Sequence, residues 1–75
     1  MFTPPVIDMM KTGANIEKLR THAGISVREI QELMGFSGTQ AIYKWQRGES
    51  LPTLDNIVAL SFILNVTIEE ILIYK

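Results

Sequence analysis

The sequence predicts an all-α protein, one compact domain of five helices preceded by an extended N-terminal arm. Four apolar stretches with helical spacing are each followed by a residue that tolerates a left-handed backbone, namely Gly24, Gly35, Gly48 and Asn65. Capping boxes of the form Ser/Thr-x-x-Glu mark two helix starts, at Ser26–Glu29 and at Thr67–Glu70. The connections between these stretches are three to six residues long, which is normal for a small helical domain.

Start and stop signals place the helices in order over residues 13–23, 27–34, 39–47, 54–64 and 68–73. The first is expected to follow Thr12, and the second follows the capping residue Ser26. The third ends before Gly48, and the fourth opens at Thr53, directly behind a proline. Thr67 opens the fifth helix.

Apolar residues within these stretches recur every three or four positions, which is the spacing of one helix face. The residues expected to face the core are Ile16, Leu19, Ile30, Met34, Ile42, Trp45, Ile57, Leu60, Ser61 and Leu64. Pro4 and Pro5 exclude helix around them, so residues 1–11 are expected to form the arm and residues 12–75 the domain.

Composition bounds the class of protein. The chain has 75 residues, enough for one domain only, and 47% of them are hydrophobic, enough for a dense core. It has no cysteine, no signal peptide and no stretch that resembles a membrane span, so we expect a cytoplasmic protein without membrane contact. The net charge of −1 argues mildly against a nucleic-acid partner, because phosphates respond to local charge rather than to the sum.

Three fragments carry a resemblance to a known family: Gly24-Ile25-Ser26-Val27-Arg28-Glu29-Ile30, Ala41-Ile42-Tyr43-Lys44-Trp45-Gln46-Arg47-Gly48 and Leu51-Pro52-Thr53-Leu54. In this order and spacing they resemble the Cro and lambda-repressor-like, or Xre-type, helix-turn-helix proteins, over about residues 12–73. The resemblance implies a sequence-specific regulator of transcription, of the repressor type, from a bacterium or phage. It also implies that the helix over residues 39–47 reads the major groove of double-stranded DNA.

The sequence departs from that family at Gln31, where a small residue is usual, and in a turn that is one residue longer. We hypothesise that the longer turn accommodates the larger side chain of Gln31.

The outward face of the third helix offers side chains that match base edges. The residues expected to contact bases are Thr39, Gln40, Tyr43 and Lys44. Gln40 can pair with adenine through two hydrogen bonds, and Lys44 can reach guanine or a phosphate. Tyr43 has an alternative, which is to pack against Phe36 and stay away from DNA.

Phosphate contacts are expected where helix N-termini present free amides, and at nearby cations. The candidates are Ser26, Val27, Arg28, Ser37, Gly38 and Arg47. Two cations have plainer alternatives. Arg28 can be an ordinary solvated residue, and Arg20 on the first helix can be structural, pairing with Gln46 where the family often has a glutamate.

No catalytic or metal site is expected, because His22 is the single histidine and no cysteine is present. No cofactor and no small-molecule ligand are expected either. A homodimer on DNA follows from the resemblance, and Val58, Phe62 and Ile73 form a possible dimer surface. In the alternative, the arm, with Val6, Ile7, Met9 and Met10, folds back over that surface. The competing function is a protein-interaction module, such as an antitoxin-like partner, built on the same fold.

Overall fold

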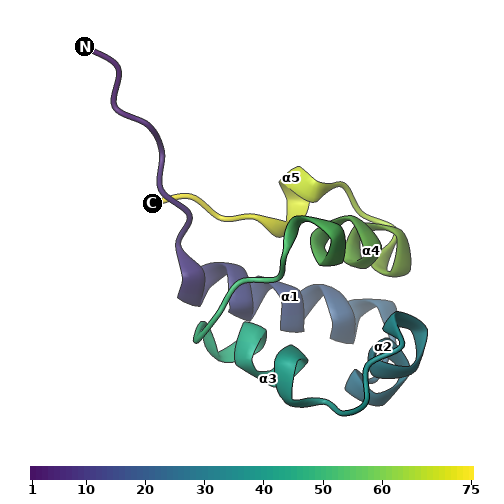
Figure 1. Cartoon of the computed structure of the whole chain (residues 1–75). Coiled ribbons are helices and arrows are strands. Elements are labelled where there is room, and N and C mark those ends of the chain that lie inside the picture. Colours follow the sequence, from purple (N-terminus) through teal and green to yellow (C-terminus); the bar gives the residue numbers. More distant parts are fainter.

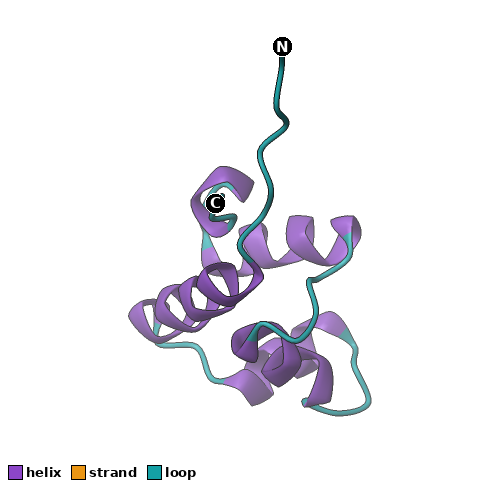
Figure 2. Cartoon of the chain, turned by 90° about the vertical axis from the view of Figure 1, so that its left-hand side faces the viewer, coloured by secondary structure: helices purple, strands orange, loops and turns teal.

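Five helices build the molecule in the computed structural model, which describes residues 1–75 (Figure 1). They are α1 (Met9–Ala23), α2 (Val27–Met34), α3 (Gln40–Arg47), α4 (Leu54–Leu64) and α5 (Ile68–Ile71). α1 runs through the middle, with α3 on one side and α4 and α5 on the other (Figure 1). No strand forms (Figure 2), which confirms the predicted all-α class. None of the helices has both the length and the apolar character that crossing a membrane requires.

The predicted signals for helix ends and the two predicted capping boxes are confirmed. The residues after α1, α2, α3 and α4 all adopt a positive φ, between 56° and 76°. Both capping boxes form, at Ser26 and at Thr67. α2 and α4 have the predicted bounds, whereas α3 begins one residue late, because Thr39 is its N-cap.

The first helix begins earlier than the sequence suggested, so the arm is shorter than expected. Asp8 is the N-cap of α1, and its carboxylate accepts a hydrogen bond from the Lys11 amide at 2.9 Å. Residues 9–11 are therefore helical, and the expectation that they belong to an extended arm was wrong. The sequence signal for this helix start is the carboxylate of Asp8, which was overlooked and which accepts from a free amide of the first turn.

Thr12 does not start a helix; it is buried within α1 and hydrogen-bonds to the C-terminal segment. Its hydroxyl accepts from the Ile73 amide at 2.9 Å and lies 3.3 Å from the Ile73 carbonyl oxygen. Asn15 adds a bond of 2.7 Å from its amide to the carbonyl oxygen of Glu70. These contacts hold the chain extended after α5, which explains why that helix ends at Ile71 and not at the predicted Ile73.

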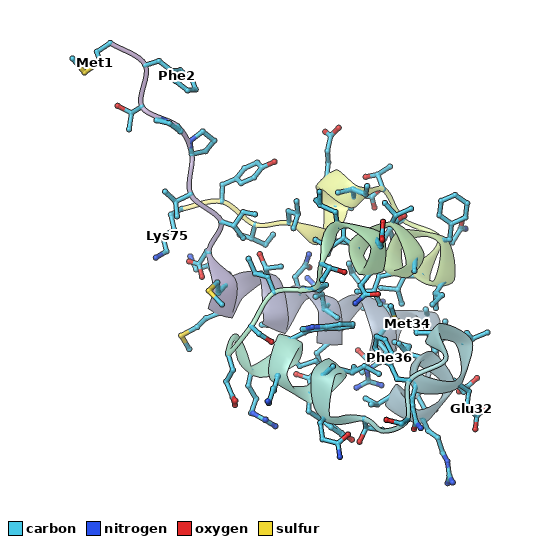
Figure 3. The ribbon with its side chains drawn as sticks, viewed as in Figure 1. Met1, Phe2, Glu32, Met34, Phe36 and Lys75 are labelled. Carbon is cyan, nitrogen blue, oxygen red and sulfur yellow. The ribbon has the colours of Figure 1, made fainter.

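The arm pairs with the end of the chain. Ile7 and Tyr74 form an antiparallel bridge, flanked by bonds of 2.7 Å from the Asp8 amide to Ile73 and from the Lys75 amide to Val6. Beyond this pairing the arm leaves the body, with Met1 and Phe2 at its far end (Figure 3).

All five helices contribute to one core. Its members are Ile16, Val27, Ile30, Ile42, Trp45, Leu60, Leu64 and Ile71. The expected inward residues Leu19 and Met34 are half-buried and pack against it. Val27 and Ile71, which the periodicity did not assign to the core, are buried as well.

Candidate nucleic-acid interface

The two faces of α3 differ sharply. Ile42 and Trp45 are 0% and 4% exposed, and the ring of Phe36 packs edge-on against Trp45 with centroids 5.9 Å apart. The opposite face leaves Tyr43 and Lys44 in solvent. Phe36 thus has Trp45 as its aromatic partner, and Tyr43, 44% exposed, is open for contact with another molecule.

α1 fixes the C-terminal end of α3. Gly13 is buried against this end, where a Cβ atom would overlap the carbonyl oxygens of Trp45 and Gln46. Arg20 donates from Nε to the Gln46 side chain at 3.0 Å and from Nη1 to the Ile25 carbonyl at 2.9 Å. The structural alternative for Arg20 is therefore confirmed, and this side chain links α3 to the start of α2.

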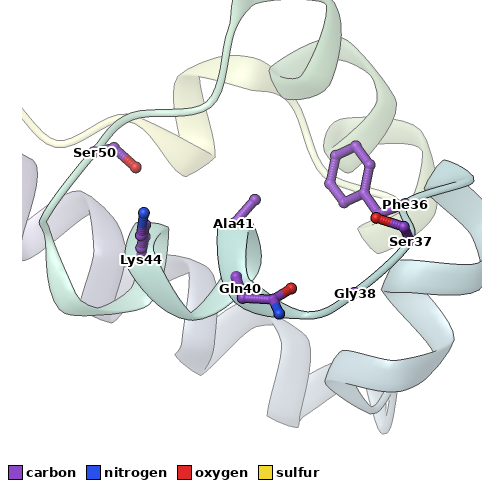
Figure 4. A pocket seen from close by; sticks show the side chains of 7 residues that line it. All are labelled: Phe36, Ser37, Gly38, Gln40, Ala41, Lys44 and Ser50. Carbon is purple, nitrogen blue, oxygen red and sulfur yellow. The ribbon is translucent and has the colours of Figure 1, made fainter.

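The N-terminal end of α3 is open by contrast. Thr39 makes no side-chain capping bond, so the amides of the first turn keep their donors free. Beside it lies a depression of about 390 Å³, lined by Phe36, Ser37, Gly38, Gln40, Ala41, Lys44 and Ser50 (Figure 4). The Gln40 amide bends back over Gly38 (Figure 4), so close that a Cβ there would overlap it. Four of the predicted contact residues therefore meet in one place, while Ser50 comes from a loop that the sequence did not implicate.

Gln31 lies beneath the turn that leads to α3. Its side chain is half-buried, and its Nε2 donates to the Phe36 carbonyl oxygen at 3.2 Å. The side chain thus supports the turn rather than pointing into solvent, which agrees with the hypothesis that links Gln31 to the longer turn.

The N-terminus of α2 offers fewer free amides than expected. The Ser26 hydroxyl accepts from the Glu29 amide, and the Glu29 carboxylate accepts from the Ser26 amide, each at 3.0 Å. The hydrogen bond from the backbone of Ser26, followed by that from its side chain, lowers the pKa of Glu29. The amides of Val27 and Arg28 remain free for a phosphate, while the Val27 side chain is buried. The Arg28 side chain is exposed at the same end.

The last residue of α3, Arg47, is exposed but already has a partner. Its Nε donates to the carboxylate of Glu49, just past the end of the helix. This hydrogen bond raises the pKa of Arg47 and lowers that of Glu49. Glu49 is a functional candidate that the sequence reading missed.

A second exposed surface lies on α4, away from α3. Val58 is 44% and Phe62 is 82% exposed, as the possible dimer surface requires, and Leu54 extends the same stripe at 83%. Ile73 is half-buried, and its backbone is held by Thr12. The arm reaches Ile73, whose carbonyl oxygen accepts from the Asp8 amide at 2.7 Å, but it leaves Val58 and Phe62 uncovered. The alternative in which the arm folds over this surface therefore holds at Ile73 only.

The structure brings no three His, Cys, Asp or Glu side chains together in a group that could hold a metal ion.

Comparisons with known proteins agree with this geometry. A helix-turn-helix family model matches residues 16–71. Among solved structures, the restriction-modification controller protein C.AhdI from Aeromonas hydrophila is 28% identical, with a TM-score of 0.76, over 85% of this chain and 96% of that one.

Two further solved structures share the fold. The DNA-binding domain of BldD is 21% identical over 87% of this chain and 93% of that one, with a TM-score of 0.72. The clp gene regulator ClgR from C. glutamicum is 17% identical over 84% and 80%, with a TM-score of 0.73. No curated protein matches the sequence. Because the family model spans most of the chain, the protein belongs to the Cro and lambda-repressor-like, or Xre-type, helix-turn-helix family of DNA-binding transcriptional regulators.

Proposed function

We propose that this bacterial or phage regulator acts in the cytoplasm and reads the major groove of double-stranded DNA with α3. One observation carries the proposal: α3 has a buried, locked face and an open polar face that begins at an uncapped N-terminus. A helix in the major groove reads bases with its N-terminal half. We therefore assign base contacts to Thr39, Gln40, Tyr43 and Lys44.

Phosphate contacts flank this reading end. We assign them to the N-terminus of α2 and the turn before α3, with Arg47 at the far end: Ser26, Val27, Arg28, Ser37, Gly38 and Arg47. Val27 contributes only its backbone amide, because its side chain is 7% exposed. Arg28 and Arg47 lie on α2 and α3, and Glu29, Glu32 and Glu49 are the acids on or next to these helices. Glu69 and Glu70 lie on α5, across α1 from α3 (Figure 1). Phosphates respond to local charge rather than to the sum, so an acidic chain is compatible with a DNA partner.

We further propose that the protein binds DNA as a homodimer. One domain of this size reads only a half-site, and two-fold symmetric sites are bound by dimers. The candidate surface is the stripe of Leu54, Val58 and Phe62 together with the predicted residue Ile73, because the stripe is apolar and exposed and α4 lies across α1 from α3 (Figure 1). C.AhdI, which is a restriction-modification controller protein, supports a role as a regulator.

Fluorescence anisotropy with a random-sequence duplex tests the DNA partner. Binding is expected to weaken steeply with salt, with a log–log slope of about −0.9 for each phosphate neutralised. Lys44→Gln is expected to weaken binding, and Glu69→Gln is the control away from the interface. Salt-insensitive or absent binding at micromolar protein would instead favour the competing function, a protein-interaction module.

Sedimentation in the presence of duplex DNA tests the dimer surface. Phe62→Glu is expected to leave a single copy on the DNA where the wild-type protein forms a dimer, because a charge in an apolar interface is strongly unfavourable. Leu33→Glu is the matched control, since Leu33 is an exposed apolar residue of α2, off the stripe. A dimer that survives Phe62→Glu would overturn the assignment of this surface.

A further inference from the structure

A carboxylate stands at the end of the helix that is proposed to read DNA. The Glu49 amide donates to the Lys44 carbonyl oxygen at 2.9 Å, in the turn that closes α3 around Gly48. This bond holds Glu49 beside the helix end, where its side chain forms the ion pair with Arg47. The two side chains are 55% and 51% exposed, so the pair is accessible from solvent.

The ion pair of Arg47 and Glu49 contributes little to the free energy of unfolding. Exposed ion pairs contribute little, because water screens them and two long side chains must be ordered. Its effect is electrostatic and local. The hydrogen bond from Arg47, and then the charges of Arg47 and Lys44, lower the pKa of Glu49, so the carboxylate is ionised beside two cations assigned to DNA.

We infer that Glu49 competes with DNA phosphate for Arg47 and thereby weakens the attraction of the protein to any duplex, whatever its sequence. A carboxylate and a phosphate oxygen use the same guanidinium donors, so DNA binding must exchange one for the other. Because phosphate contacts supply essentially all non-specific affinity, this competition leaves a larger share of binding to the base contacts of α3. The inference rests on the proposed function.

Glu49→Gln tests it, because it removes the charge and keeps the size of the side chain. The variant is expected to bind a random duplex about 3- to 10-fold more tightly at ~0.1 M salt, and the salt slope is expected to steepen by up to about 0.9, because Glu49 no longer neutralises the charge of Arg47. Glu69→Gln is the matched control: it makes the same change in net charge on an exposed residue of α5. Both variants are also made in an Arg47→Ala background.

Competition predicts that the gain is specific to Glu49 and disappears when Arg47 is absent. An equal effect of Glu49→Gln and Glu69→Gln would overturn the inference, since total charge would then be the cause. A gain that persists with Arg47→Ala would also overturn it, because Glu49 would then repel phosphate directly. If the wild-type protein itself shows no salt-dependent DNA binding, the proposed function fails, and that result is distinct from both of the others.

Discussion

The two ends of α3 are built in opposite ways. At the C-terminal end, Gly13 brings the backbone of α1 against the carbonyl oxygens of Trp45 and Gln46, and Arg20 bonds the Gln46 side chain at 3.0 Å. At the N-terminal end, Thr39 makes no capping bond and the neighbouring side chains line an open depression. The helix is thus fixed where it does not meet bases and left adaptable where it is proposed to meet them.

This difference shows how a domain of 75 residues can hold a reading helix rigidly without occupying its reading groups. The orientation of α3 comes from close backbone packing on α1 at Gly13 and from buried side chains such as Ile42 and Trp45, which face away from the proposed DNA contacts. The polar side chains near its N-terminus therefore remain free for a partner, as pre-organised recognition requires.

The largest effect is expected from a substitution at the contact between α1 and the C-terminal end of α3. Gly13→Ala places a methyl group against the backbone of α3, which cannot move aside as a side chain can. We expect a loss of about 3 kcal/mol in the free energy of unfolding, at the upper end of overpacking effects, together with weaker DNA binding. Urea denaturation measures the loss. Ala14→Gly is the neighbouring control, at an exposed helix position, and should cost about 1 kcal/mol. A loss at Gly13 no larger than at Ala14 would contradict the close approach.

A smaller effect is expected from the side-chain link at the same end. Arg20→Ala removes bonds to Gln46 and to the Ile25 carbonyl and should lower the free energy of unfolding by about 1.5 kcal/mol. Gln46→Glu sharpens the test by changing the amide acceptor into a carboxylate, which should stabilise the protein by up to about 0.5 kcal/mol. Both are measured by urea denaturation at pH 7. Destabilisation by Gln46→Glu would show that Arg20 does not bond this side chain in solution.

The smallest effect is expected at the open end. Thr39→Ala removes no capping bond, so it should change the free energy of unfolding by less than about 0.5 kcal/mol. Thr67→Ala makes the same substitution at an N-cap whose hydroxyl accepts from Glu70 at 3.1 Å, and should cost about 1 kcal/mol. Equal losses in thermal or urea unfolding would mean that Thr39 caps α3 after all.

Local signals predicted most of the fold, because they act within a few residues. Gly24, Gly35, Gly48 and Asn65 each close a helix, as expected. The start of α1 depends on a local signal that was missed, the carboxylate of Asp8. The end of α5 could not be predicted in this way, since it depends on Thr12, which bonds a residue 61 positions away. No local pattern in the sequence predicts such a long-range contact.

In the candidate site too, residues on a helix could be predicted from the sequence and residues in a loop could not. The outward residues of α3 follow from helical spacing to Ile42 and Trp45, and the resemblance to the family supplied their role. The pairing of Glu49 with Arg47 and the approach of Ser50 to the depression were missed, because a loop has no periodicity from which to infer direction. The exposure of Leu54 was missed too, since its spacing alone is equally typical of a buried residue.

Base reading by α3 is tested by selecting bound sequences from a randomised duplex pool, with the wild-type protein and the Gln40→Ala, Lys44→Ala double variant side by side. We expect the wild-type protein to enrich a short, two-fold symmetric motif. The double variant should lose that motif while keeping its free energy of unfolding, because both side chains are exposed at the open end of α3. Enrichment of the same motif by the double variant would contradict the claim that these side chains read the bases.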